Sequence, residues 1–380
     1  MRQLAGTVQN SPPNPQEVEV SLFGPGFGEC VVLHLGKGEW VVVDSCRDAD
    51  TGLPAAIDYL QKLDVDLATS VRLVVATHWH DDHMDGLADL FRACRSAKFV
   101  CSMALNCEEW FALSEVYRGY LQAGGSGVDE LRQTMQELKR RNAANAVVAP
   151  QFALAKQPLY VRANGMPAEV VALSPSNAAV AVMQAHLQQR LLPQEKQRRL
   201  RVPDLRENDG SVVLSMRVGS ASVLLGADLE ERGRPGLGWQ AILDEYETDA
   251  KGYEGMKIPH HGSETGHHPQ QWSRLMSQQA WATLTPCNRG TKLPTPEDCR
   301  RILSHTEDSF ITSPRGLGKF RHPDAAVMKT VQEATLSIGI EPGKQGHIRL
   351  RRNALGTASE WEAELFGNAL PLRRILHLVE

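Results

Sequence analysis

The segment THWHDDHMDG, residues 77–86, constrains the fold of this chain more than any other stretch of its sequence. It follows an apolar run whose length and β-branched residues are typical of a strand. In an extended loop, the side chains of residues two positions apart point the same way, so His78 and His80 can bind one ion. Asp82 and His83 come after the turn and can face a neighbouring ion. Imidazole and carboxylate ligands without paired cysteines suit Zn²⁺, Mn²⁺ or Fe in an open catalytic site. The segment therefore predicts a metal centre at the edge of a sheet.

Apolar runs and turn residues along the rest of the chain predict a mixture of strands and helices. Strands are expected at residues 17–23, 30–35, 39–43, 71–76, 98–102, 159–161, 168–173, 255–259, 280–285, 309–312 and 347–351, with a further hairpin between 208 and 228. Helices are expected at residues 53–63, about 84–94, 238–246, 270–277, 296–305 and 324–333. Because strand pairs and helices are mixed in both halves, this order predicts an α+β fold. It favours two sheets covered by helices over a single doubly wound parallel sheet.

We expect one large domain with additions at both ends. Residues 1–16 are rich in Pro, Asn and Gln, which is typical of a flexible arm. Residues 17–352 form the domain, with helical insertions at about 103–145 and 178–206. Residues 353–380 form a C-terminal extension packed on it.

The composition argues against several classes of protein. With 380 residues and a net charge of −4, the chain has no overall positive field of the kind that marks non-specific nucleic-acid binders. Its N-terminus lacks an apolar stretch of signal-peptide length, and no run approaches a membrane span. Seven cysteines without regular spacing do not indicate a disulfide framework. We therefore expect a cytoplasmic protein.

The H-x-H-x-D-H pattern after an apolar strand resembles the signature of the metallo-β-lactamase superfamily. The resemblance implies an αββα sandwich of two mixed β-sheets flanked by helices. It also implies a centre of one or two divalent ions, Zn or Mn, at the top edges of the sheets. Asp44, which closes VVVD, would orient the metal-binding loop, and Asp228, which closes VLLGAD, would bridge two ions. The stretch KIPHHGS would supply a late histidine ligand. The implied ligand set is His78, His80, Asp82, His83, Asp228 and His261.

Two positions of this pattern stay open. KIPHHGS contains both His260 and His261, and the spacing in related branches favours His261 as the ligand, with His260 near the substrate. The superfamily commonly supplies one more histidine between the first motif and Asp228. The only histidine in that interval is His186, which lies in the polar insertion. The first ion would then have two histidines, Asp228 and solvent as ligands.

Catalytic roles are expected for Asp82 and His260. Asp82 can serve as proton acceptor for the attacking water. Asn208 and Ser263 can donate hydrogen bonds to a substrate oxygen or an aspartate, or act as turn and cap residues.

A narrower resemblance concerns the substrate. The series Ser174-Pro175, NDGSVVL, LLGAD, PHHGS and TPCNRG…LPTPEDCRRIL resembles the hydrolase domain of bacterial competence DNA-uptake channel proteins and their soluble relatives. It runs from about residue 17 to 351 and implies the hydrolase without the membrane pore. The leading hypothesis is thus a phosphodiesterase or nuclease, with DNA or a nucleotide as substrate.

Basic runs at residues 196–201 and 349–352 could track a phosphate backbone, although the first could equally be a solvated helix face. The alternatives are hydrolysis of a small ester, thioester or lactone by the same centre, and a metal-binding module without turnover. The oligomeric state is not indicated.

Overall fold

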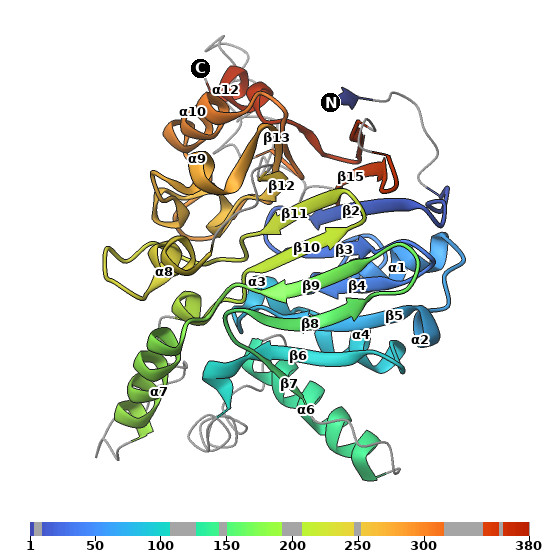
Figure 1. Ribbon diagram of the computed structural model, residues 1–380, viewed down its shortest axis with the longest axis vertical. Helices are drawn as coiled ribbons and strands as arrows, with labels where there is room; N and C mark the ends of the chain where they lie inside the picture. The colour runs from blue at the N-terminus through green and yellow to red at the C-terminus, as the bar shows by residue number, and fades with distance from the viewer. Residues whose placement is uncertain are drawn as a thin grey trace, which may run out of the picture.

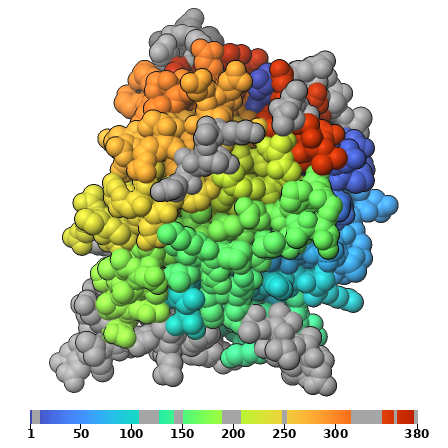
Figure 2. All heavy atoms as spheres, viewed as in Figure 1, coloured from blue at the N-terminus to red at the C-terminus, as the bar shows by residue number. Residues whose placement is uncertain are grey.

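The computed structural model describes residues 1–3, 10–106, 127–143, 150–191, 207–246, 252–314, 345–356 and 360–379. Within these ranges the strands form two sheets that pack face to face, with helices on both outer sides (Figure 1). The predicted αββα sandwich of two mixed sheets is therefore confirmed. In Figure 2 the green and yellow segments lie across the middle of the face, the orange segments lie above them, and blue and cyan segments of the first sheet emerge at the right edge.

The first sheet is antiparallel on one side and parallel on the other. Among the described residues its order is β1 (Arg2–Gln3), β16 (Glu362–Phe366), β15 (Gly346–Asn353), β2 (Glu17–Gly24), β3 (Cys30–His34), β4 (Trp40–Val43), β5 (Val71–Ala76), β6 (Lys98–Ser102) and β7 (Gln151–Ala153). Strands β2 to β4 pair antiparallel, whereas β4 to β7 are parallel. The C-terminal ends of β4 and β5 therefore meet at one edge of the sheet, where residues 77–86 begin.

The second sheet repeats this division. Its order among the described residues is β17 (Leu370–Pro371), β14 (Ser309–Ile311), β13 (Met276–Leu284), β12 (Tyr253–Lys257), β11 (Ala221–Leu225), β10 (Leu214–Val218), β9 (Ala168–Ala172) and β8 (Gln157–Arg162). Strands β8 to β11 pair antiparallel, and β11 to β14 are parallel. The C-terminal ends of β11 and β12 thus lie together as well.

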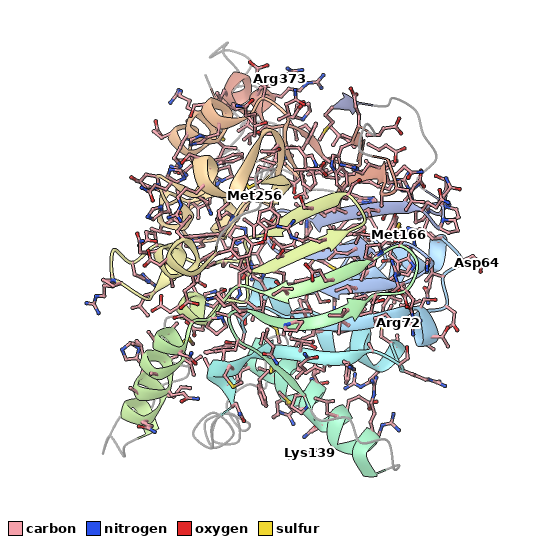
Figure 3. All side chains as sticks on the ribbon, viewed as in Figure 1. Asp64, Arg72, Lys139, Met166, Met256 and Arg373 are labelled. Carbon is pink, nitrogen blue, oxygen red and sulfur yellow. The ribbon has the colours of Figure 1, made fainter. Side chains whose placement is uncertain are left out.

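Three apolar layers hold the sandwich together, because side chains alternate between the two faces of each strand. Val75 and Val223 lie between the sheets. Phe99 faces the helices on the first sheet, and Met256, labelled in Figure 3, faces those on the second. The first group of helices is α1 (Ala55–Lys62), α2 (Leu67–Ser70), α4 (Leu87–Ala93), α6 (Gly127–Ala143) and α7 (Asn177–Leu191). The second group is α8 (Gly238–Glu245), α9 (Gln271–Leu275), α10 (Pro296–His305) and α12 (Arg373–Val379).

Some elements have the expected bounds and others differ; β13, expected at residues 280–285, begins at Met276. β5, β6 and α10 have the predicted ends, whereas the helix expected at about 84–94 is divided into α3 (Asp81–Met84) and α4. Gly86 separates them with a φ of 82°, and Asp85 is held outside the helix by Arg47, whose Nε lies 3.1 Å from its Oδ1. The helix expected at 324–333 lies outside the described residues.

The two ends of the chain take part in the sheets. Arg2–Gln3, the start of the expected arm, pairs with β16 in parallel. In the expected C-terminal extension, β16 belongs to the first sheet and β17 to the second, so this segment crosses from one sheet to the other. None of the helices in the described ranges combines the length and apolar character needed to cross a membrane.

Candidate metal centre

Asp44 organises the histidine loop from the end of β4. Thr77 donates its backbone N–H to Asp44 Oδ1 and its hydroxyl to Oδ2, both over 2.7 Å. Asp44 Oδ2 also lies 2.7 Å from His83 Nδ1. A carboxylate on one ring nitrogen fixes the tautomer and orientation of a ligating imidazole, so His83 presents Nε2 to the centre. The position predicted for Asp44 matches this arrangement.

The second sheet brings Asp228 and His261 to the same place. Asp228 follows β11 after a tight turn in which Ala227 has a φ of 45°. His260 and His261 follow β12 with φ values of 47° and 52°. Positive φ is costly for residues other than glycine and tends to cluster at functional sites. Both segments thus hold a strained backbone where they approach the histidine loop.

Two groups of potential ligands share one carboxylate oxygen. In the first, His78 Nε2 lies 3.1 Å from His80 Nδ1 and 3.9 Å from Asp228 Oδ2. In the second, Asp82 Oδ2 lies 3.1 Å from His261 Nε2 and 4.0 Å from His83 Nε2. Asp228 Oδ2 also lies 3.4 Å from both of these imidazole nitrogens. The structure therefore brings all six predicted ligands together.

These separations fit a metal ion. Two atoms that are each about 2.1 Å from one tetrahedral Zn²⁺ lie about 3.4 Å apart, and the measured spacings scatter around this value. His83 Nε2 is buried and has no hydrogen-bond partner among the described residues, as expected of a ligand atom. With Asp228 counted in both, the second group offers four ligand atoms and the first offers three. The first group leaves a position for solvent or substrate, as catalytic zinc sites do.

The centre also has the electrostatics of a cation site. Burial alone would lower the pKa of His83 and His261, but Asp228 and Asp82 outweigh it and hold the pKa of both imidazoles well above the usual value. Burial opposes ionisation of the two aspartates, yet His83 and His261 hold the pKa of each carboxyl below its usual range. Burial and the neighbouring His83 lower the pKa of His78, which leaves its Nε2 lone pair free to bind. The buried carboxylates of Asp82 and Asp228 are stabilised by positive charge, which a divalent ion would provide.

A buried ion pair behind the centre was not predicted from the sequence. Lys257 Nζ lies 2.5 Å from Glu29 Oε1 and 3.7 Å from Asp228 Oδ1, and it donates to the carbonyl of Ala227. Thr285 donates its hydroxyl to Glu29 Oε2 and lies 3.1 Å from His261 Nδ1. The pair therefore links Asp228 and His261 on the side that faces away from the other candidate ligands. Its only sequence signal is a lysine at the end of an apolar strand, directly before PHH.

Two acidic residues and an amide lie around the metal centre, next to His80 and His260. Glu207 Oε2 lies 3.3 Å from His80 Nε2, on the far side of that imidazole from His78. Asn208 donates to Glu230 Oε1 over 2.8 Å, and its Nδ2 lies 3.4 Å from His260 Nε2. Glu207 was also missed, because nothing in its local sequence marks it as a partner of a histidine 127 positions earlier.

The other predicted residues have distinct places. His260 lies beside the centre, with Nδ1 2.8 Å from Thr265 Oγ1. Ser263 accepts a hydrogen bond from the backbone N–H of Thr265 and caps the 3₁₀ turn Glu264–Gly266, so the cap reading holds for it. His186 lies on α7, in neither ligand group.

The basic run at residues 349–352 is engaged in ion pairs. Arg349, Arg351 and Arg352 form ion pairs with Glu364, Glu19 and Glu254, respectively. These ion pairs, and the burial of Arg349 and Arg352, argue against the expectation that this run binds a phosphate backbone. Residues 196–201 lie outside the described residues.

A comparison with protein-family models finds a match to the segment that contains the histidine loop. The sequence model of the metallo-β-lactamase superfamily matches residues 23–120, which include Asp44 and the H-x-H-x-D-H pattern. Residues 23–120 are therefore similar in sequence to the metallo-β-lactamase superfamily. Members of this superfamily are generally hydrolases and use divalent metal ions, often zinc.

Two solved structures show a distant likeness to this chain. The crystal structure of the metallo-β-lactamase SMB-1 bound to 2-mercaptoethanesulfonate is 12% identical, with a TM-score of 0.30, over 70% of this chain and 88% of that chain. Zn²⁺-bound PqqB from Methylobacterium extorquens is 10% identical, with a TM-score of 0.28, over 60% of this chain and 59% of that chain.

Proposed function

We propose that this chain is a metal-dependent phosphodiesterase that cleaves DNA or nucleotides at a centre of two divalent ions, Zn or Mn. The observation that carries the proposal is Asp228 Oδ2, the oxygen shared by both ligand groups. Paired ions about 3.5–4 Å apart recur in nucleases and phosphatases, where they activate water and stabilise the attacking and leaving oxygens. The resemblance to the competence-type hydrolase domains adds support for a phosphodiester substrate.

Each ligand group would hold one ion. His78 and His80 would bind the first and His83, Asp82 and His261 the second, with Asp228 between them. Asp44 would keep His83 in the ligating orientation through its 2.7 Å contact.

Asp82 and His260 would act on the attacking water and the substrate, respectively. Asp82 lines a cavity of about 260 Å³ beside the centre, so its carboxylate can accept a hydrogen bond from the attacking water and orient it. The His260 side chain is 20% exposed beside the centre, where a substrate can reach it. His260 would contact the substrate there.

The test is hydrolysis of bis-p-nitrophenyl phosphate and short DNA by protein loaded with Zn²⁺ or Mn²⁺, with metal content measured in parallel. Asp82→Asn should lower kcat by at least about 100-fold, since it removes a ligand and a proton acceptor together. Asp64→Asn is the matched control, because Asp64 lies exposed at the edge of the molecule (Figure 3). Turnover of thioesters or lactones alone would contradict the proposal. So would stoichiometric metal without hydrolysis.

A further inference from the structure

A cavity of about 260 Å³ opens beside the centre, with Asp82 on its wall. The other lining residues that matter here are Phe27, Arg47, Asp81, Asp85 and Arg289. Because Asp82 belongs to both the cavity and the second ligand group, a molecule whose reacting bond lies at the ions can extend into this space. The charges around the cavity decide which chemical group it accepts.

Most of these charges already have partners. Arg47 lies 3.1 Å from Asp85 Oδ1 and 2.6 Å from Asp89 Oδ2, so two carboxylates balance its charge. Asp82 faces His261 over 3.1 Å. Asp81 is exposed and accepts a hydrogen bond from the backbone N–H of Gly127 over 2.7 Å.

Arg289 differs from Arg47 in this respect. Its guanidinium lies over the ring of Phe27, 3.8 Å from the centroid, and no carboxylate of the described residues pairs with it. A guanidinium stacked on an aromatic ring is held in plane, while the N–H groups along its edge stay free. Such a planar fork matches the oxygens of a phosphate or carboxylate.

The backbone fixes this arrangement from both sides. Phe27 lies between β2 and β3, Arg289 lies between β13 and α10, and the N–H of Asn288 donates to the carbonyl of Gly26 over 2.8 Å. Gly26 has a φ of 110°, and a Cβ there would lie 2.6 Å from Asn288 Nδ2. The positive φ favours glycine at residue 26, the backbone hydrogen bond joins the two loops, and Arg289 lies on Phe27 without a ligand.

We propose that Arg289, seated on Phe27, binds a phosphate adjoining the phosphodiester that is cleaved at the metal centre. The inference rests on the proposed function and makes its substrate class narrower: an oligonucleotide or a nucleotide with a second phosphate, rather than an isolated diester. The exposed carboxylate of Asp81 confines this anion to the Arg289 side of the cavity.

The experiment measures binding without turnover. Metal-free protein is titrated with the dinucleotides TpT, pTpT and TpTp by calorimetry at low and high salt. We expect pTpT or TpTp to bind about 10-fold more tightly than TpT, as one charge-assisted contact provides, with the advantage reduced by salt. Arg289→Gln should abolish the preference and Arg289→Lys should keep part of it, because lysine retains the charge without the fork.

Arg95→Gln is the control, since Arg95 is an exposed arginine and the substitution changes the net charge equally. Equal affinity of the wild-type protein for the three dinucleotides would overturn the inference, and so would an Arg289→Gln variant that keeps the preference. If the protein prefers pTpT or TpTp but never hydrolyses a phosphodiester, the proposed function is wrong and the anion site at Arg289 is still supported.

Discussion

At the scale of single residues, Lys257 shows how the centre depends on charges behind it. The lysine is buried and is matched by Glu29 and Asp228. Lys257→Met would leave two buried carboxylates without their cation. Breaking a buried ion pair from one side typically costs about 3–5 kcal/mol of stability. We expect a loss of this size in urea unfolding, together with weaker metal binding, because Asp228 would lose the neighbouring charge of Lys257, whose Nζ lies 3.7 Å from Oδ1.

Two variants separate charge from packing in this experiment. Lys257→Met combined with Glu29→Gln should recover part of the stability, because only one carboxylate then remains unmatched. Lys62→Met removes the exposed pair with Asp58 and should cost at most about 1 kcal/mol. Equal losses in Lys257→Met and Lys62→Met would mean that the buried pair does not support the centre.

His34 gives the fold a dependence on pH that is independent of any metal. Burial lowers its pKa to about 4, and its Nε2 accepts a hydrogen bond from the N–H of Gly38 over 3.1 Å. The unfolded chain takes up this proton near pH 6.5 and the folded protein only near pH 4, so stability should fall as pH falls between these values. The contribution is at most about 3 kcal/mol. The free energy of unfolding, measured against pH, should fall more steeply for the wild-type protein than for His34→Gln between pH 6.5 and pH 4. Above pH 7 the two curves should run parallel.

At the scale of elements, the break between α3 and α4 positions two of the candidate ligands. Gly86 allows it with a φ of 82°, and a Cβ there would lie 2.9 Å from Pro54 Cγ. Gly86→Ala should therefore destabilise the protein through both backbone strain and a clash, and it should weaken metal binding by displacing α3. Gly52→Ala is the matched control, with a φ of 69° and open space around its Cβ. We expect Gly86→Ala to cost at least about 1 kcal/mol more than the control in urea unfolding. An equal loss of stability in the two variants would show that Pro54 moves aside without a measurable penalty.

The elements also show what local sequence can and cannot predict. β5, β6 and α10 were predicted to the residue, because apolar runs or a Thr-Pro cap with Asp298 at the third position define their ends locally. The break at Gly86 was missed, because it depends on Arg47, which lies 38 positions before its partner Asp85. Short strands such as β16 and β17 were missed as well, since sheet partners that are distant in sequence define them.

The same division applies to the candidate site. The residues of the histidine loop are neighbours in sequence, so their spacing predicted a common position, and resemblance supplied Asp228 and His261. Glu29, Lys257 and Glu207 stayed hidden because each gains its role only from a partner on another segment. The fold, and not the neighbouring sequence, brings these three charges to their partners.

At the scale of the whole molecule, the centre joins the two sheets. His78, His80, Asp82 and His83 follow β5 of the first sheet, whereas Asp228 and His261 follow β11 and β12 of the second. A bound ion is therefore a cross-link between layers that are otherwise held by apolar packing, and it should stabilise the entire sandwich. At a free Zn²⁺ or Mn²⁺ concentration 100 times Kd, binding adds about 2.7 kcal/mol, or roughly 3 °C in Tm for a chain of this length.

Asp228→Asn tests this coupling most directly, because Asp228 is shared by both ligand groups. Thermal unfolding with chelator and with metal should show the shift in the wild-type protein and little or none in Asp228→Asn. Asp244→Asn changes an exposed carboxylate on α8 and should keep the full shift. If Asp228→Asn kept it too, the stabilising ions would bind elsewhere on the protein. A shift that is lost only in Asp228→Asn would instead mean that the ions hold the two sheets together at the edge where the histidine loop lies.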